Sequence, residues 1–110
     1  MSLDAAATFG IAAVALVACA AAVLADDTNT IVQTGRAFHP NEITIPAGTT
    51  LDFSNQDDFL HQIYVDTEGF NYDSAEQEPG QVFHITFPTA GTFAVRCHIH
   101  PKMLLTVHVK

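Results

Sequence analysis

Short stretches in which apolar and polar residues alternate dominate this chain from residue 42 to its end. In an extended strand such alternation places successive side chains on opposite faces, so each stretch predicts a strand with one buried face. Turn residues such as Pro46-Ala47-Gly48 and Pro88 to Gly91 separate the stretches. No long helical periodicity is present, and the acidic residues 67–80 predict a loop with at most one helical turn. The pattern therefore predicts an all-β chain, folded as a β-sandwich.

The alternation also assigns a face to each residue with metal-binding chemistry. Three such residues share the face of their stretch that carries the core aliphatics, and we expect them to point inward: His61, Cys97 and Met103. His84 and His108 alternate with core residues and should point to solvent.

An apolar, uncharged run from Ala5 to Ala25 precedes Asp26 and Asp27. This order is typical of a secretory signal. We therefore expect a signal segment over residues 1–25 and one domain over residues 26–110. The residues before the run lack Lys and Arg, which leaves two alternatives open. One is an uncleaved anchor, since about 20 apolar residues can span a bilayer. The other is a lipoprotein signal in which Cys19 becomes the lipidated residue. All three predict a periplasmic or otherwise exported domain, with membrane contact only through an anchor or a lipid.

The expected domain is acidic, with four basic and eleven acidic residues and a net charge of −7. This charge argues against binding to nucleic acid and suits a positively charged or neutral partner. Cys97 is the single cysteine of the domain, so it cannot form an internal disulfide. An unpaired thiol in an exported protein is open to oxidation unless a ligand occupies it, and a metal ion is the obvious occupant.

Thiolate, imidazole and thioether groups occur together in the segment from Cys97 through His100 to Met103, at C-x2-H-x2-M spacing. Taken singly, Cys97 or Met103 is best interpreted as a core residue. A second imidazole must come from elsewhere, and His61 is the inward-facing candidate. Two His, one Cys and a weak axial Met form the ligand set of blue-copper electron-transfer sites. We therefore expect one type 1 copper ion held by His61, Cys97, His100 and Met103.

Other metals fit this ligand set less well. Structural zinc is generally held by four Cys or His ligands, and an iron–sulfur cluster needs more cysteines. Calcium and magnesium require oxygen ligands. A binuclear copper centre would need a second cysteine in the loop, where His98 stands instead.

With these motifs the chain resembles the cupredoxin family, and within it the amicyanin- and plastocyanin-like proteins. The resemblance extends over about residues 31–110. It rests on the similar segments 38–51, 55–61 and 87–93 and on the matching ligand loop of Cys97, His100, Pro101 and Met103. It implies a Greek-key β-sandwich and a blue copper protein that shuttles single electrons between redox partners. On this basis we expect no enzymatic activity and no catalytic residues.

The resemblance also implies that donor and acceptor proteins dock near His100, on an apolar patch for which the candidates are Phe59, Leu60, Pro101 and Leu104. We expect the protein to be a monomer. Gln62 stands where some members have an Asn that braces the ligand loop, and His98 stands beside the cysteine where Thr, Ser or Ala is frequent. We expect His98 and His39 to be surface residues.

The alternative function is a periplasmic copper carrier or chaperone with the same fold. Such proteins expose Met- and His-rich segments, whereas this chain has only Met103 after Met1. A multicopper enzyme would need further ligands and a second domain, which about 85 residues do not supply. A metal-free adhesion domain would leave the ligand motif unexplained.

Overall fold

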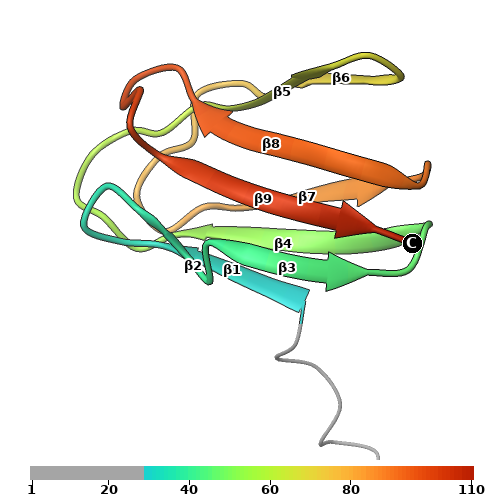
Figure 1. The fold of residues 1–110 in the computed structure, drawn as a ribbon. Helices are drawn as coiled ribbons and strands as arrows, with labels where there is room; N and C mark the ends of the chain where they lie inside the picture. Colours follow the sequence, from blue (N-terminus) through green and yellow to red (C-terminus); the bar gives the residue numbers. More distant parts are fainter. Residues whose placement is uncertain (1–28) are drawn as a thin grey trace, which may run out of the picture.

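The computed structural model describes residues 29–110, which form two β-sheets packed face to face (Figure 1). Within this part of the chain no helix is long and apolar enough to cross a membrane. The predicted signal segment over residues 1–25 and the alternative lipidation of Cys19 lie outside the described residues. The nine strands are β1 (Thr30–Gln33), β2 (Phe38–His39), β3 (Glu42–Ile45), β4 (Thr49–Asn55), β5 (Ile63–Thr67), β6 (Phe70–Asp73), β7 (Val82–Phe87), β8 (Gly91–Cys97) and β9 (Leu104–Val109).

One sheet has four strands in the order β2-β1-β4-β7, and the other has five in the order β3-β9-β8-β5-β6. Both sheets are mixed, because β1 pairs in parallel with β4 and β3 pairs in parallel with β9, while the remaining pairs are antiparallel. The all-β sandwich predicted from the alternation is therefore confirmed.

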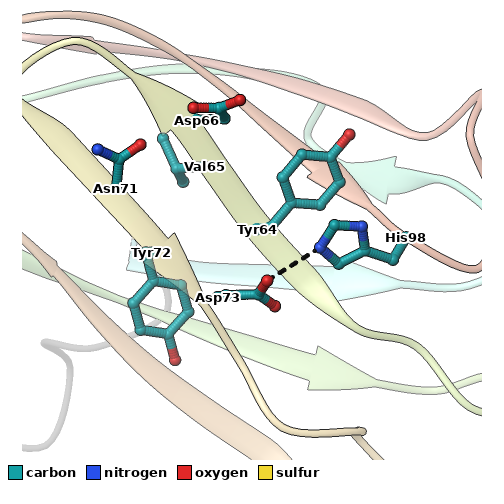
Figure 2. A pocket seen from close by; sticks show the side chains of 7 residues that line it. All are labelled: Tyr64, Val65, Asp66, Asn71, Tyr72, Asp73 and His98. Carbon is teal, nitrogen blue, oxygen red and sulfur yellow. Dashed lines mark hydrogen bonds and ion pairs between the residues drawn. The ribbon is translucent and has the colours of Figure 1, made fainter.

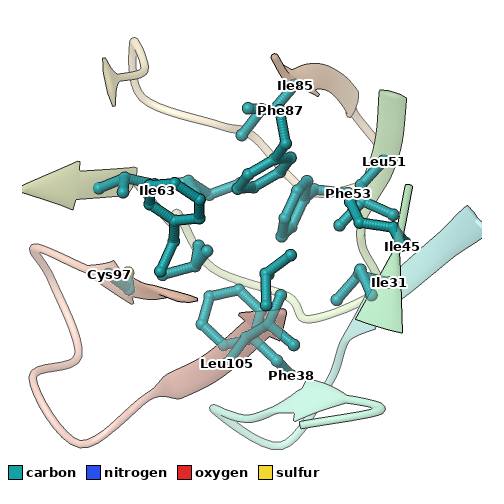
Figure 3. Packing of buried hydrophobic residues seen from close by; sticks show 14 of the residues in the cluster. Ile31, Phe38, Ile45, Leu51, Phe53, Ile63, Ile85, Phe87, Cys97 and Leu105 are labelled. Atoms are coloured by element: carbon teal, nitrogen blue, oxygen red, sulfur yellow. The ribbon is translucent and has the colours of Figure 1, made fainter. Parts of the chain in front are cut away.

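Inward-facing side chains of both sheets form one core (Figure 3). Its aromatic part joins Phe70, Phe87 and Phe93, with ring centroids 5.2 to 6.1 Å apart, while Phe38 packs edge-on against Phe53 at 6.0 Å. Each fully buried apolar side chain of this size contributes about 1.5–3 kcal/mol through the hydrophobic effect. Cys97 belongs to this core, so its thiol lies among close-packed side chains.

Two local predictions were wrong. Residues 67–80 hold a strand, β6, instead of a loop, and β6 pairs antiparallel with β5 through partners such as Val65 and Tyr72. The alternating stretch that contains His61 was predicted to be a strand, but the strand, β5, includes only the part from Ile63 onward. His61 still faces inward, because its backbone makes an isolated bridge to Gln77.

Loops gather at the end of the sandwich opposite the C-terminus (Figure 1). They are the β1–β2 loop, the β4–β5 loop and the β8–β9 loop, and all of the predicted metal ligands lie in them or at their edges. The antiparallel register brings these loops together, because Ile63 pairs with Cys97 and Arg96 pairs with Leu104. The fold thus collects residues 61, 97, 100 and 103 at one end.

Candidate metal centre

Three donor atoms from two loops converge at this end of the sandwich. Nδ1 of His61 lies 3.5 Å from Sγ of Cys97 and 3.3 Å from Nδ1 of His100, and Sγ lies 3.9 Å from Nδ1 of His100. His61 and Cys97 are buried and His100 is half-buried. The three residues form the one group of His, Cys, Asp or Glu side chains within residues 29–110 that is arranged to hold a metal ion.

The spacing of these donors fits a single ion. Typical bond lengths are about 2.0 Å to imidazole nitrogen and about 2.3 Å to thiolate sulfur. Three donors in a plane around such an ion would be separated by about 3.5 Å for the two nitrogens and about 3.7 Å for nitrogen and sulfur. The three observed distances lie within a few tenths of an ångström of these values. Two imidazoles and one thiolate in a trigonal arrangement are the equatorial donor set of blue copper.

Cys97 ends strand β8 and is 1% exposed. The backbone N–H of Gln62 donates to Sγ of Cys97 over 3.3 Å, and the N–H of His98 donates to the carbonyl of Gln62 over 2.9 Å. These bonds tie the cysteine to the chain segment that carries His61. The backbone of Gln62 therefore braces the site, while its side-chain amide donates to Asp73 and to the carbonyl of Ser74.

His61 is held at both its backbone and its ring. Its N–H donates to the carbonyl of Gln77 over 3.0 Å, and its carbonyl accepts from the N–H of Gln77 over 2.7 Å. Its Nε2 lies 2.8 Å from Oδ2 of Asp57, a side chain that is 8% exposed. A carboxylate only accepts, so Nε2 carries the proton, and Nδ1 presents its lone pair toward Cys97.

Asp57 is itself held by the β1–β2 loop. Gly35 and Arg36 both have positive φ values, of 65° and 56°, so their successive N–H groups form a concave anion site. The N–H of Gly35 donates to Oδ1 of Asp57 over 2.7 Å, and the N–H of Arg36 donates to Oδ2 over 3.2 Å. Burial acts to raise the pKa of Asp57, but the hydrogen bonds from His61, Gly35 and Arg36 outweigh it, and the pKa lies below its ordinary value.

His100 and Met103 belong to the β8–β9 loop. The N–H of Met103 donates to the carbonyl of His100 over 3.0 Å, which closes the loop into a tight turn, and Met103 is 2% exposed. Burial is the largest cause that lowers the pKa of His100; the charges of His61 and Arg36 add to it, and Asp57 opposes it. A lowered pKa keeps the imidazole neutral near pH 7, in the form that binds a metal ion.

Phe59 fills the space beside both imidazoles. Its ring centroid lies 5.5 Å from that of His61 and 5.1 Å from that of His100. The guanidinium of Arg36 covers the Phe59 ring at 4.8 Å. Phe59 therefore shields the two imidazoles.

The remaining histidines lie outside this cluster. His98 points away from Cys97, stacks on Tyr64 at 3.8 Å and bonds to Asp73 over 3.1 Å (Figure 2). His39 lies on the surface within 3.1 Å of the carbonyl of Thr34. The predicted outward direction of the other two is also found, since His84 pairs with Asp52 and His108 with Glu42.

Sequence reasoning missed the residues that support the ligands, namely Asp57, Asn55 and Gln77. The amide of Asn55 donates to the carbonyls of Phe59 and Gln77, so it fixes the loop that leads to His61. A usable signal for Asp57 exists, because a metal-binding His generally donates its second N–H to a carboxylate or carbonyl. That rule does not choose between Asp57 and the adjacent Asp58, whose side chain is exposed.

The chain is similar to known copper proteins. Residues 6–107 match the family model of the cupredoxin-like domain. The plastocyanin of Ulva prolifera is 34% identical over 84 residues, which cover 64% of this chain and 86% of that protein. The chain spans less than half of the length of the chloroplastic plastocyanins that it matches, such as that of Physcomitrium patens.

Solved structures show the same fold. The purple cupredoxin of Nitrosopumilus maritimus has a TM-score of 0.65 at 27% identity and covers 74% of this chain and 98% of its own. A reduced amicyanin variant has a TM-score of 0.70 at 22% identity, with 82% and 89% coverage, which shows the fold alone. The cupredoxin-like fold and the donor set of His61, Cys97 and His100 both indicate one copper ion as the cofactor. The chain belongs to the cupredoxin-like family.

Proposed function

We propose that the protein is an exported carrier of single electrons whose copper ion is held by His61, Cys97, His100 and Met103. The observation that carries the proposal is the meeting of two imidazole nitrogens and one thiolate sulfur at 3.3 to 3.9 Å from one another, with a buried Met in the same loop. When bound, the ion supplies a Cu(II)/Cu(I) couple. Transfer moves one electron in and one electron out, and no bond of a substrate forms or breaks.

The chain's own residues suit this task by keeping the donors in place. The ring of His61 is anchored by Asp57, Sγ of Cys97 is anchored by the N–H of Gln62, and the loop of His100 is closed by Met103. When the protein holds the ligands in place, the site keeps nearly the same geometry in both oxidation states. Little reorganisation then accompanies electron transfer. An anchored ligand set of this kind supports electron transfer more than copper delivery, since delivery requires the ligands to let go.

Electrons are proposed to pass through His100, which is the ligand nearest to solvent. It lines a hollow together with Arg36, Ile99, Pro101 and Lys102. The buried Cys97 and His61 have no such access. We propose that the partners are redox proteins that dock on this side, that the protein acts as a monomer, and that its folded domain spans residues 26–110 after a signal segment.

A visible absorption spectrum of the copper-loaded protein tests the function. Thiolate-to-Cu(II) charge transfer should give an intense band that ascorbate bleaches and ferricyanide restores, and Cys97→Ser should abolish it. The Ser variant removes the sulfur with little change in volume, so a retained circular dichroism spectrum shows that the fold is intact. A protein that binds Cu(I) without a coloured oxidised form would instead be a copper carrier, and the electron-transfer proposal would be wrong.

A further inference from the structure

Two hollows meet at the end of the sandwich that bears His100, and the same two cations stand between them. One hollow of about 420 Å³ is lined by Arg36, Ile99, His100, Pro101 and Lys102. The other, of about 430 Å³, lies beside Arg36 and Lys102 along residues 37–41 and 103–104. No carboxylate lines either hollow. We call both hollows together the Arg36–Lys102 surface.

The hollow that contains His100 is mainly apolar between its cations, whereas the second hollow also contains the polar residues His39 and Asn41. Among residues 29–110, the large apolar side chains that are well exposed are Ile99, Leu104 and Val82, at 41%, 39% and 44%. Ile99 and Leu104 both lie on the Arg36–Lys102 surface, on either side of Lys102. Burying exposed apolar area is favourable at about 25 cal/mol per Å², so a partner that covers Ile99 and Leu104 is bound more tightly.

The two cations are free to bind a partner. Within residues 29–110 neither Arg36 nor Lys102 forms an ion pair with a carboxylate. Arg36 is fixed over the ring of Phe59, which packs on His100, so its charge stays beside the proposed electron exit. Asp57 is nearby, but its side chain is 8% exposed and its oxygens accept three N–H groups.

The local charge is therefore opposite to the net charge of the chain, which is −8. A third hollow, on strands β5 and β6, shows the contrast: it contains Asp66 and Asp73 and neither Lys nor Arg (Figure 2). Net charge acts on a partner at long range, whereas the charges around a contact surface decide its orientation. Of the three hollows described within residues 29–110, the two at the end that bears His100 offer an anionic surface a favourable contact.

We propose that the Arg36–Lys102 surface docks a redox protein whose own contact surface is apolar and edged by carboxylates. This inference rests on the proposed function, because it identifies the kind of partner that exchanges electrons through His100. The carboxylates pair with Arg36 and Lys102, and the apolar centre covers Ile99 and Leu104. An acidic surface that approaches the hollow on β5 and β6 meets Asp66 and Asp73, so the two cations favour the orientation with His100 at the contact.

Paramagnetic line broadening locates the surface without any electron transfer. Hexacyanochromate(III), a trivalent anion, is titrated into the ¹⁵N-labelled copper(I)-loaded protein at low ionic strength. We expect amide signals of residues 36–37 and 99–104 to broaden first, and Lys102→Gln to weaken this broadening severalfold. Lys110→Gln is the matched control, because the same charge is removed at the far end of the six-residue strand β9, about 20 Å away. Broadening elsewhere, or equal loss in both variants, overturns the proposal.

Stopped-flow oxidation separates this inference from the proposed function. In this step one electron leaves the copper(I) protein and reduces ferricyanide to ferrocyanide. At about 0.01 M ionic strength, where the Debye length is about 30 Å, Arg36→Gln and Lys102→Gln should each slow the reaction about fivefold, and Lys110→Gln less than twofold. The cationic oxidant tris(phenanthroline)cobalt(III) should react faster with the first two variants. Equal rates in all variants overturn the inference, whereas anion binding at the surface without any oxidation overturns the proposed function alone.

Discussion

Replacing Asp57 by Asn keeps the shape of a side chain that joins the β1–β2 loop to His61, and removes its charge. The carboxylate accepts N–H groups from Gly35 at 2.7 Å, Arg36 at 3.2 Å and His61 at 2.8 Å. An amide has one acceptor oxygen. If that oxygen faces Arg36 and His61, the NH₂ group opposes the N–H of Gly35, and one bond is lost.

The expected cost follows from this count. Hydrogen bonds to a charged group contribute about 1.5–3 kcal/mol and neutral ones about 0.5–1.5 kcal/mol. Losing the bond at the exposed Gly35 and weakening the other two should destabilise the metal-free protein by about 2 kcal/mol. For a domain of this size, 1 kcal/mol shifts Tm by about 4–8 °C, so Tm should fall by about 10 °C.

Thermal melting of the metal-free protein, followed by circular dichroism, measures this effect. Asp58→Asn is the control, because it makes the same change at the exposed neighbouring position and should shift Tm by less than about 3 °C. The folded pKa of Asp57 lies below its unfolded value of about 3.9, so its contribution is present above that value and is lost as pH falls through the folded pKa. The Tm deficit of Asp57→Asn should therefore be constant from pH 5 to pH 8 and shrink below about pH 4. Equal Tm values for the two variants would refute the role given to Asp57.

Four further substitutions test the core, its edge and the proposed axial ligand. Neither the amide nitrogen nor the amide oxygen of the buried Gln33 has a hydrogen-bond partner, so Gln33→Met should raise the free energy of unfolding by about 1 kcal/mol. Gln77→Met removes the hydrogen bonds to the carbonyls of Phe53 and Gln81 and should lower the free energy of unfolding by about 2 kcal/mol. Urea denaturation measures both effects. Burial, followed by the charge of Asp73, raises the pKa of Tyr72. The contribution of neutral Tyr72 to the stability of the fold is therefore complete below about pH 10 and is lost as pH rises through the folded pKa. Above about pH 10 the free energy of unfolding should fall more steeply in the wild type than in Tyr72→Phe. Met103→Leu should keep copper and its colour but raise the reduction potential, as voltammetry would show, because an axial thioether tunes the site without providing its charge-transfer band.

Local alternation was enough to predict much of the sandwich. It predicted the strands that contain Ile45, Phe53, Ile85, Val95 and Val107. Each of these strands has one buried face, so buried and exposed side chains alternate along it. Strand β6 was missed although Phe70 and Tyr72 alternate with polar residues, because four residues within acidic surroundings give a weak signal. The inward direction of His61 was correct for a different reason than expected, namely its bridge to Gln77.

In the metal site, too, the sequence predicted one part, the proposed ligands, and missed the other, the residues that support them. Cys97, His100 and Met103 lie close together in sequence, so their spacing identified them as a group. Asp57 lies only four residues before His61, but its own support by Gly35 and Arg36 depends on contacts with a loop that is 22 and 21 residues away in sequence. Alternation and spacing describe one segment at a time, and neither contains information about which loop meets which.

The parallel pairing of β3 with β9 has a consequence for the order in which the molecule is completed. Within residues 29–110, strand β9 is synthesised after the other eight strands, yet it lies between β3 and β8 in its sheet. While β9 is still missing, β3 has no neighbour in its sheet, and the β8–β9 loop that carries His100 and Met103 has no strand to close it. Pairing between such distant segments is slow. A nascent chain that lacks β9 therefore cannot hold the proposed ligands in their final arrangement, and we expect copper loading to follow synthesis of β9.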